Sequence, residues 1–351
     1  MLTFFPGPSQ VYAETGLYLQ DAFQSGILSV SHRSDTFNKL SEETLKLLHI
    51  KLAIPENYTI LYTSSATESW EIISQSLTKK QSAHYSSGSF GDKWFQYAQA
   101  IHPDSRKFSV HVNEELHPKY LDLNANDDLV CLTQNETSNG TQIGFETLAA
   151  LRAAFPDNLL ALDCTSSMAG INLPFILGDI WFASVQKCFG LPAGLGLLIL
   201  SPAAVNRAKE IGDKKYYNSV LTMLEHIEKF QTSCTPNVLG IYLLNRVLHN
   251  SPGIEQTDAL LRKRMQAYIN IFDGSELKPL ITNVNTRSST VLAVEGDPEL
   301  IEGIKVEAKA NGILLGSGYG KWKPNTFRIA NFPAYTNEQV EQLTQFLLKE
   351  R

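Results

Sequence analysis

Short apolar runs alternate with longer helical patterns along the first 250 residues, and this alternation limits the fold more than any other feature. Five runs predict strands: Thr59–Thr63, Leu129–Thr133, Leu159–Asp163, Ile180–Val185 and Leu195–Leu200. Helical patterns between them cover Ala66–Leu77 and Glu146–Phe155, and the latter stops before Pro156. Such an order is typical of a mainly parallel sheet covered by helices. The sequence therefore predicts an α/β fold.

The last third of the chain has a different pattern. Helices are predicted over Val238–Asn250 and Glu255–Phe272, and strands over Ser289–Val294 and Thr326–Ile329. Ser251-Pro-Gly253 predicts a bend between the two helices, and Thr336 with Gln339 forms a capping box before a final helix. We expect a large α/β domain over residues 16–255. Residues 1–15 and 256–351 would form a smaller α+β domain.

Charge and hydropathy exclude several classes of protein. The 30 basic and 36 acidic residues leave a net charge of −6 without a basic stripe, so we expect no nucleic-acid partner. The apolar stretch near Leu191–Leu200 is about half the ~20 residues of a membrane helix, and the N-terminus lacks a signal-peptide pattern. The four cysteines and eight histidines lack metal-site spacing. We expect a cytoplasmic protein with no membrane partner and no metal.

Polar residues follow the predicted strands, where an open parallel sheet binds its ligands. Asp163 ends one strand, Gln186-Lys187 follows another, and the hydroxyl-rich segments Thr63–Thr67 and Thr133–Thr137 follow two more. A carboxylate, an amine and a helix N-terminus suit pyridoxal 5′-phosphate. The amine bonds to its aldehyde, the carboxylate keeps the pyridine nitrogen protonated, and the helix N-terminus receives the phosphate.

Each of these residues alone also has a simpler interpretation. Asp163 could cap a helix, Lys187 could be a solvated surface lysine, and the hydroxyls of Thr63–Thr67 could only cap the following helix. Their joint position at strand ends favours a cofactor site but leaves a nucleotide-binding module open. Gly316–Gly320 predicts a flexible loop near the rim of the site.

Several short motifs, in order along nearly the whole chain, resemble one enzyme family. They are Phe5-Pro-Gly-Pro-Ser9, Ser31-His-Arg33, Asn135-Glu-Thr137, Asp163-Cys-Thr-Ser166, Gln186-Lys187 with Pro192-Ala-Gly194, and Phe327-Arg-Ile329. Together they resemble the phosphoserine aminotransferases, which belong to class V of the fold-type-I pyridoxal-phosphate enzymes. The resemblance implies a cytoplasmic homodimer of serine biosynthesis. It would exchange amino groups between L-phosphoserine/3-phosphohydroxypyruvate and 2-oxoglutarate/L-glutamate by a ping-pong cycle.

The same resemblance implies roles for individual residues. Lys187 would bind the cofactor and carry the substrate proton, Asp163 would hold the pyridine nitrogen, and Phe90 would stack on the ring. The remaining cofactor contacts would be Ala66, Thr67, Thr137, Thr165 and Gln186, with Thr235 reaching the cofactor phosphate of the neighbouring subunit. Arg328 would clamp the substrate α-carboxylate, and His32 with Arg33 would bind the side-chain phosphate across the subunit interface.

Three positions depart from the family pattern. Phe90 stands where Trp is usual, Thr67 where an Arg is usual, and Lys321 near a usual His. Losing a bidentate arginine weakens selection for a phosphorylated substrate, for which Lys321 or Lys323 could compensate as point charges. The alternative function is a class V aminotransferase for a small unphosphorylated donor, serine or alanine, with pyruvate or glyoxylate. A cysteine desulfurase and a cofactor-binding protein without turnover fit the motifs less well.

Overall fold

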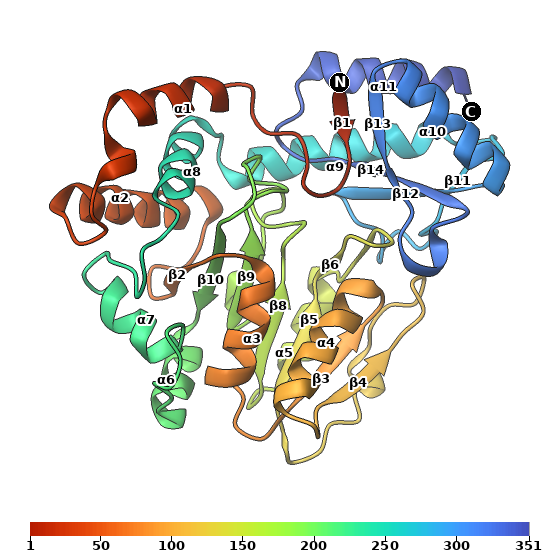
Figure 1. Ribbon diagram of the computed structural model, residues 1–351. Coiled ribbons are helices and arrows are strands. Elements are labelled where there is room, and N and C mark those ends of the chain that lie inside the picture. The colour runs from red at the N-terminus through yellow and green to blue at the C-terminus, as the bar shows by residue number, and fades with distance from the viewer. Residues whose placement is uncertain (351) are drawn as a thin grey trace.

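A seven-stranded sheet forms the larger part of the molecule, which a computed structural model describes over residues 1–350. Its strand order is β2-β10-β9-β8-β5-β3-β4 (Figure 1). The strands are β2 (Thr59–Thr63), β3 (Gln81–Ser86), β4 (Arg106–Ser109), β5 (Asp127–Thr133), β8 (Leu159–Asp163), β9 (Ile180–Ser184) and β10 (Gly196–Leu200). Strand β10 runs antiparallel to both of its neighbours, and the other pairs are parallel. The predicted mainly parallel α/β fold is confirmed.

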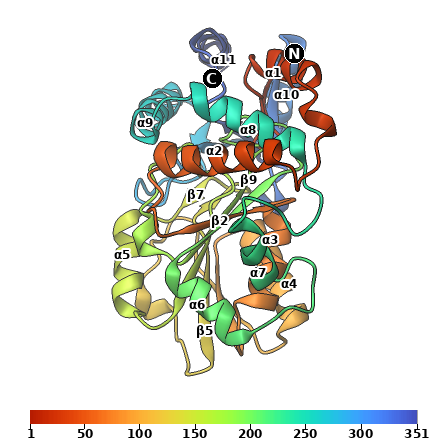
Figure 2. The same ribbon diagram turned by 90° about the vertical axis from the view of Figure 1, so that its left-hand side faces the viewer.

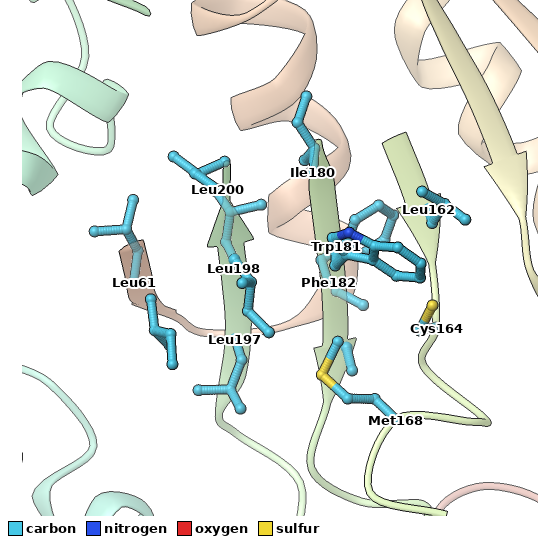
Figure 3. Close-up of a cluster of buried hydrophobic side chains, with 14 of the residues drawn as sticks. Leu61, Leu162, Cys164, Met168, Ile180, Trp181, Phe182, Leu197, Leu198 and Leu200 are labelled. Atoms are coloured by element: carbon cyan, nitrogen blue, oxygen red, sulfur yellow. The ribbon is translucent and has the colours of Figure 1, made fainter. Parts of the chain in front are cut away.

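Helices cover both faces of this sheet, so its central strands are buried on two sides. Figure 2 shows α5 (Phe145–Ala154) on one side and α3 (Ala66–Ser76) with α4 (Ser89–Ile101) on the other. The central strands are therefore continuous apolar runs rather than alternating ones. In Figure 3, Leu61, Trp181 and Leu198 belong to one packed cluster from three adjacent strands, and each is nearly inaccessible to solvent.

A second sheet, in the order β1-β13-β14-β12-β11, combines both ends of the chain. Its strands are β1 (Leu2–Phe4), β11 (Lys278–Pro279), β12 (Val291–Glu295), β13 (Ile313–Ser317) and β14 (Thr326–Ala330). Strand β1 pairs in parallel with β13, so both chain ends lie at this sheet (Figure 1). Its separate core includes Phe4, Tyr268 and Phe327. The domain limits after residues 15 and 255 stay predictions.

The remaining elements complete the layers. They are α1 (Thr15–Gln24), α2 (Asp35–Leu52), α6 (Pro202–Ile211), α7 (Val220–Ile227), α8 (Val238–Asn250), α9 (Ile254–Ile271), α10 (Pro298–Ala310), α11 (Asn337–Glu350), a β6–β7 hairpin (Asn135–Glu136, Thr141–Gln142) and the 3-10 turns η1 (Ile27–Ser29), η2 (Pro118–Tyr120), η3 (Phe175–Leu177) and η4 (Gly320–Trp322). The capping box before α11 is confirmed, because Thr336 and Gln339 exchange backbone-to-side-chain hydrogen bonds of 3.1 and 3.3 Å. Within residues 1–350, no helix has the length and apolar content needed to cross a membrane.

Sequence reasoning left several elements unpredicted, among them β1, β4, α1 and α4, and two further differences have a clear physical reason. It missed β3, because its buried side chains include polar ones that satisfy each other: Ser82 bonds to His84 at 2.8 Å, and Gln81 donates to Asp127 at 2.7 Å. It also treated Gly316–Gly320 as a loop, whereas Gly316 and Ser317 lie in β13, paired with β14. Only the residues after Ser317 leave the sheet, and they carry Tyr319 toward the large sheet.

Candidate active site

A cavity of about 170 Å³ lies where strands of the large sheet end. It is lined by Gly7, Pro8, Ala66, Thr67, Trp70, Phe90, Thr133, Asn135, Thr137, Asp163, Thr165, Ser184, Gln186 and Lys187. Because β5, β8 and β9 are parallel, the segments after them meet at one edge of the sheet. The cavity thus collects almost every cofactor contact expected from the sequence; Thr235 is the exception.

Lys187 is the buried amine of this cavity. It follows β9, its side chain is 6% exposed, and its Nζ donates a hydrogen bond of 2.7 Å to Thr137 Oγ1. Burial lowers the pKa of Lys187 to about 8, and the nearby carboxylates of Asp163 and Glu136 oppose that shift. With a pKa near 8, roughly a tenth of Lys187 is uncharged at neutral pH, far more than for an ordinary lysine, and this fraction is available as a nucleophile and base.

Asp163, the last residue of β8, is the buried carboxylate. Its Oδ1 accepts hydrogen bonds from the Thr165 N–H at 2.9 Å and the Thr165 hydroxyl at 2.6 Å. Its Oδ2 accepts a longer bond of 3.3 Å from Trp70 Nε1. Burial raises the pKa of Asp163, while the Thr165 donors and Lys187 favour the charged form. These donors fix the carboxylate's orientation beside the cavity.

A hydrogen-bonded network holds the segment after β5. Thr137 Oγ1 donates to Ser166 Oγ at 3.0 Å, and Ser166 Oγ donates in turn to the Asn135 carbonyl at 2.9 Å. The Asn135 amide donates to Ser166 Oγ and to Thr290 Oγ1, at 2.8 and 2.9 Å. The Thr137 hydroxyl is thereby held against Lys187 by residues that follow β8 and precede β12.

The N-terminus of α3 forms another wall. Ser65 caps the helix by accepting the Glu68 N–H at 3.1 Å, and the Ala66 N–H donates to Ser184 Oγ at 2.7 Å. Thr67 is exposed at the same helix end. The positive end of the helix dipole, together with the hydroxyls around it, favours an anion such as a phosphate.

Arg328 of β14 brings the second sheet to the site. Its Nη1 donates to the Thr137 carbonyl at 2.7 Å, and its Nε donates to the Ser317 carbonyl at 2.8 Å. The side chain is 4% exposed, and burial lowers the pKa of Arg328 to about 10. No carboxylate within residues 1–350 forms an ion pair with it, so its Nη2 is free for a substrate carboxylate.

Glu136 belongs to the site, although the sequence analysis gave it no role. It is fully buried, and it accepts the backbone N–H groups of Phe90 and Gly91 at 3.0 and 3.1 Å and that of Ser138 at 2.9 Å. A Cβ at Gly88 would lie 2.5 Å from Glu136 Cγ, so only glycine fits there. The side chain therefore anchors the start of α4, which carries Phe90. The available signal was its place inside the motif Asn135-Glu-Thr137, of which only Thr137 was given a role.

Gly7 covers the cavity from the N-terminal segment. Its φ of +151° disfavours other residues, and a Cβ there would lie 2.9 Å from Lys187 Cε. The Ser9 N–H also donates to the Gln186 carbonyl at 3.1 Å. The segment that follows β1 thus passes directly over Lys187.

The structure leaves three expected site residues outside this cavity. Arg33 is exposed between η1 and α2, where its Nη1 contacts His226 Nδ1 at 3.1 Å and donates to Gln231 Oε1 at 2.9 Å. His32 is next to it, and partial burial, together with the charges of Arg33 and His226, lowers the pKa of His32. Thr235 is exposed and lines a separate cavity of about 200 Å³ with Gln231. A single chain does not bring these residues to Lys187.

The residues present fit pyridoxal 5′-phosphate. The cavity offers an amine, a carboxylate, a hydroxyl beside the amine and a helix N-terminus. Two further buried polar atoms among its lining residues, Thr133 Oγ1 and Asn135 Oδ1, have no hydrogen-bond partner within residues 1–350. A polar ligand would supply such partners.

The chain belongs to the aminotransferase class-V family, whose model matches residues 6–318. It is a pyridoxal-phosphate-dependent transaminase, and amino acids and 2-oxo acids are the substrates of such enzymes. A phosphoserine aminotransferase of Corynebacterium glutamicum (strain R) is 27% identical and aligns with 96% of this chain and 91% of its own.

Solved structures show the same fold. The phosphoserine aminotransferase SerC from Cytophaga hutchinsonii superposes with a TM-score of 0.95 at 30% identity, covering 99% of this chain and 98% of that one. An aspartate aminotransferase from Thermus thermophilus superposes with a TM-score of 0.87 at 19% identity, over 100% and 99% of the two chains. The predicted class V, fold-type-I architecture and its cofactor are confirmed.

Proposed function

We propose that this protein is a phosphoserine aminotransferase. It would move the amino group between L-phosphoserine and 2-oxoglutarate, with 3-phosphohydroxypyruvate and L-glutamate as the other pair. The observation that carries the proposal is the convergence of Lys187, Asp163 and Arg328 in one chain, with an amine, a carboxylate and a guanidinium at adjoining positions. The choice of phosphoserine is supported by relatives bearing that name, similar over nearly the whole chain.

In this proposal Lys187 is the base. Pyridoxal phosphate, when bound, supplies an electron-withdrawing ring that stabilises negative charge at the substrate Cα. The uncharged Lys187 amine takes the proton from that Cα and returns it at the end of the transfer. Thr137 Oγ1 holds Nζ in place at 2.7 Å, so the base needs little reorganisation before it acts.

Asp163 and the other residues that line the cavity would bind the cofactor and orient it. The Asp163 carboxylate would keep a proton on the pyridine nitrogen, because a buried carboxylate held by Thr165 stabilises a cation strongly. The helix N-terminus at Ala66 and Thr67 would receive the phosphate, with Thr165 and Gln186 nearby. The Phe90 ring would stack on the pyridine ring. Gly7 and Pro8 limit the access of water to Lys187.

Arg328 would bind the substrate α-carboxylate through its free Nη2. The two backbone carbonyls that accept from Nη1 and Nε hold the guanidinium plane fixed. A planar, preoriented guanidinium binds a carboxylate at a smaller entropic cost than a lysine does.

We further propose that the enzyme is a homodimer in which His32, Arg33 and Thr235 serve the partner's site. All three lie outside the cavity of their own chain, and Arg33 is exposed. A twofold interface repeats each contact, so one surface can serve both sites.

A second candidate is a transaminase for serine or alanine. The observation in its favour is that Thr67, a hydroxyl, lines the cavity where a guanidinium would bind a substrate phosphate, while Arg33 is bonded to His226 and Gln231. Without a cation for the phosphate, the preference for phosphoserine would be lost.

Amino donors offered one at a time to the cofactor-loaded enzyme distinguish the two candidates. Phosphoserine, glutamate, serine and alanine are added singly, and the change in cofactor absorbance gives the half-reaction rate. We expect phosphoserine and glutamate to react faster than serine and alanine. A faster reaction with serine or alanine would replace the first proposal with the second.

A further inference from the structure

Two aromatic rings from distant segments of the chain stack at the rim of the cavity. Phe90 lies on α4, and Tyr319 lies in the segment between β13 and η4. Their ring centroids are 5.5 Å apart, with 27° between the planes. Phe90 also lines the cavity, so Tyr319 extends its wall outward.

Lys93 lies on the same face of α4 as Phe90, because residues three apart on a helix are neighbours. Its Nζ donates a hydrogen bond of 2.7 Å to Tyr319 Oη. The same Nζ lies 5.6 Å from the Phe90 centroid and 5.3 Å from the Tyr319 centroid. The ammonium is thus held at the ring pair by three contacts, although the residue is exposed.

No carboxylate in the described part of the chain forms an ion pair with Lys93. The adjacent acidic residue, Asp92, instead accepts from Lys107 at 3.0 Å and from Ser86 at 2.9 Å. The positive charge of Lys93 therefore has no fixed counter-ion and stays available to an anion.

The two cations of the active site lie against the same rings. Lys187 Nζ is 5.1 Å from the Phe90 centroid, and Arg328 Cζ is 5.4 Å from the Tyr319 centroid. A substrate whose α-carboxylate is bound by Arg328 therefore has a second positive charge at the rim. That arrangement suits an amino acid with an anionic side chain and gives nothing to alanine.

Other cations are less well placed within one chain. Arg33 is bonded to His226 and Gln231, away from the cavity. Lys321 lies over the ring of its neighbour Trp322, with Nζ 4.7 Å from the centroid. Lys93, in contrast, lies at the Phe90–Tyr319 ring pair itself.

We propose that Lys93, held by Tyr319, binds the side-chain anion of the substrate, either a phosphate or a distal carboxylate. This assignment rests on the proposed function and names the residue that makes up for the missing guanidinium at Thr67. An ammonium has three N–H donors and no fixed plane, so after bonding Tyr319 it keeps two donors for either anion. Tyr319 keeps its own O–H as a further donor.

The test compares K93Q, K93R and Y319F by half-reaction kinetics with glutamate, phosphoserine, alanine and serine. K93Q should lower kcat/KM about tenfold for the two acidic donors, the lower end of the loss expected for one charge-assisted hydrogen bond, and leave alanine and serine within about twofold. K93R should restore much of the loss, because it keeps the charge. Y319F should show a smaller loss in the same direction.

A matched control is K80Q, which removes the same charge from an exposed lysine. Lys80 directly precedes β3 and so lies at the amino ends of the parallel strands, away from the cavity at their carboxyl ends. K80Q should leave all four donors unchanged. Equal losses for acidic and neutral donors with K93Q, or no loss, would overturn the assignment.

Failure of the proposed function would look different. Wild-type enzyme that uses glutamate but ignores phosphoserine contradicts phosphoserine as substrate. The role of Lys93 is then tested by comparing the effect of K93Q on kcat/KM for glutamate with its effect for alanine. Wild-type enzyme that uses only neutral donors contradicts both proposals.

Discussion

The buried cavity around Lys187 and the exposed surface around Arg33 are constructed in opposite ways. In the cavity, desolvation lowers the pKa of Lys187 to about 8 and raises that of Asp163, and each charged group has neighbours that fix its orientation. At the surface, Arg33 and Thr235 are exposed, and the Arg33 guanidinium contacts the side chains of His226 and Gln231. One chain thus supplies all the residues expected to transfer the proton. The residues expected to bind phosphate, in contrast, can reach a cavity only if it belongs to a second chain.

The largest effect should follow removal of the cavity's amine. Lys187→Ala takes away both the covalent attachment point and the base, so turnover should fall by at least about 10²–10⁴-fold, the range for a positioned general base alone. Reduction of the loaded wild-type enzyme with borohydride, followed by peptide mapping, should label Lys187 and no other residue. Labelling of another lysine would show that the cavity has been assigned wrongly.

Asp163→Asn should preserve cofactor binding but reduce turnover. The amide keeps the shape and still accepts from Thr165, but it no longer carries the charge that stabilises a protonated ring nitrogen. We expect a loss of about 10²–10³-fold, as for other preorganised electrostatic groups. Cofactor content measured by absorbance separates binding from catalysis. Turnover close to wild type would refute the role of Asp163.

Most of the fold and the centre of the cavity could be predicted because they follow local rules. Strands β2 and β8 begin and end at the predicted residues, since their buried apolar side chains stand out in the sequence. Lys187 and Asp163 could be found because each directly follows a central strand. Glu136 and β3 could not, because their polar side chains are stabilised by partners distant in sequence, such as Phe90 N–H and Ser105 Oγ.

The neighbours of a surface residue are still harder to predict from sequence. Nothing in Ser31-His-Arg33 indicates that Arg33 would lie against His226 and Gln231, almost 200 residues away. The same holds for Lys93, whose contact with Tyr319 joins α4 to the segment after β13. Specificity residues at such junctions therefore need the structure, whereas the residues of proton transfer do not.

Arg33→Ala tests the surface region directly. If Arg33 binds the substrate phosphate, phosphoserine turnover should fall about 10–100-fold, as expected for a lost charge-assisted hydrogen bond, and alanine turnover should change little. Equal losses for both donors would point to a structural role at the start of α2.

A mixture of Arg33→Ala and Lys187→Ala chains sharpens this test. In a heterodimer, the site with an intact Lys187 receives an intact Arg33 only if Arg33 crosses the interface. Half of a random mixture is heterodimer with one restored site of two, so about a quarter of wild-type activity should return. A fully active monomer in sedimentation, or no recovery on mixing, would contradict the shared site.

The smallest effect should come from Glu136→Gln, and it concerns the pH at which the cavity becomes competent. Covalent uptake of the cofactor by the apo-enzyme needs an uncharged Lys187, so its rate should rise with pH through a midpoint near the lysine's pKa of about 8. The Glu136 carboxylate favours the charged lysine and so raises that pKa. Removing the carboxylate charge must therefore lower the midpoint, by up to about one pH unit, and speed uptake at neutral pH by less than about tenfold.

Glu136→Gln also costs an acceptor for the α4 backbone, so thermal unfolding must be measured beside it. A less stable variant with an unchanged midpoint would show that Glu136 only anchors α4, whereas a lowered midpoint shows that its charge reaches Lys187.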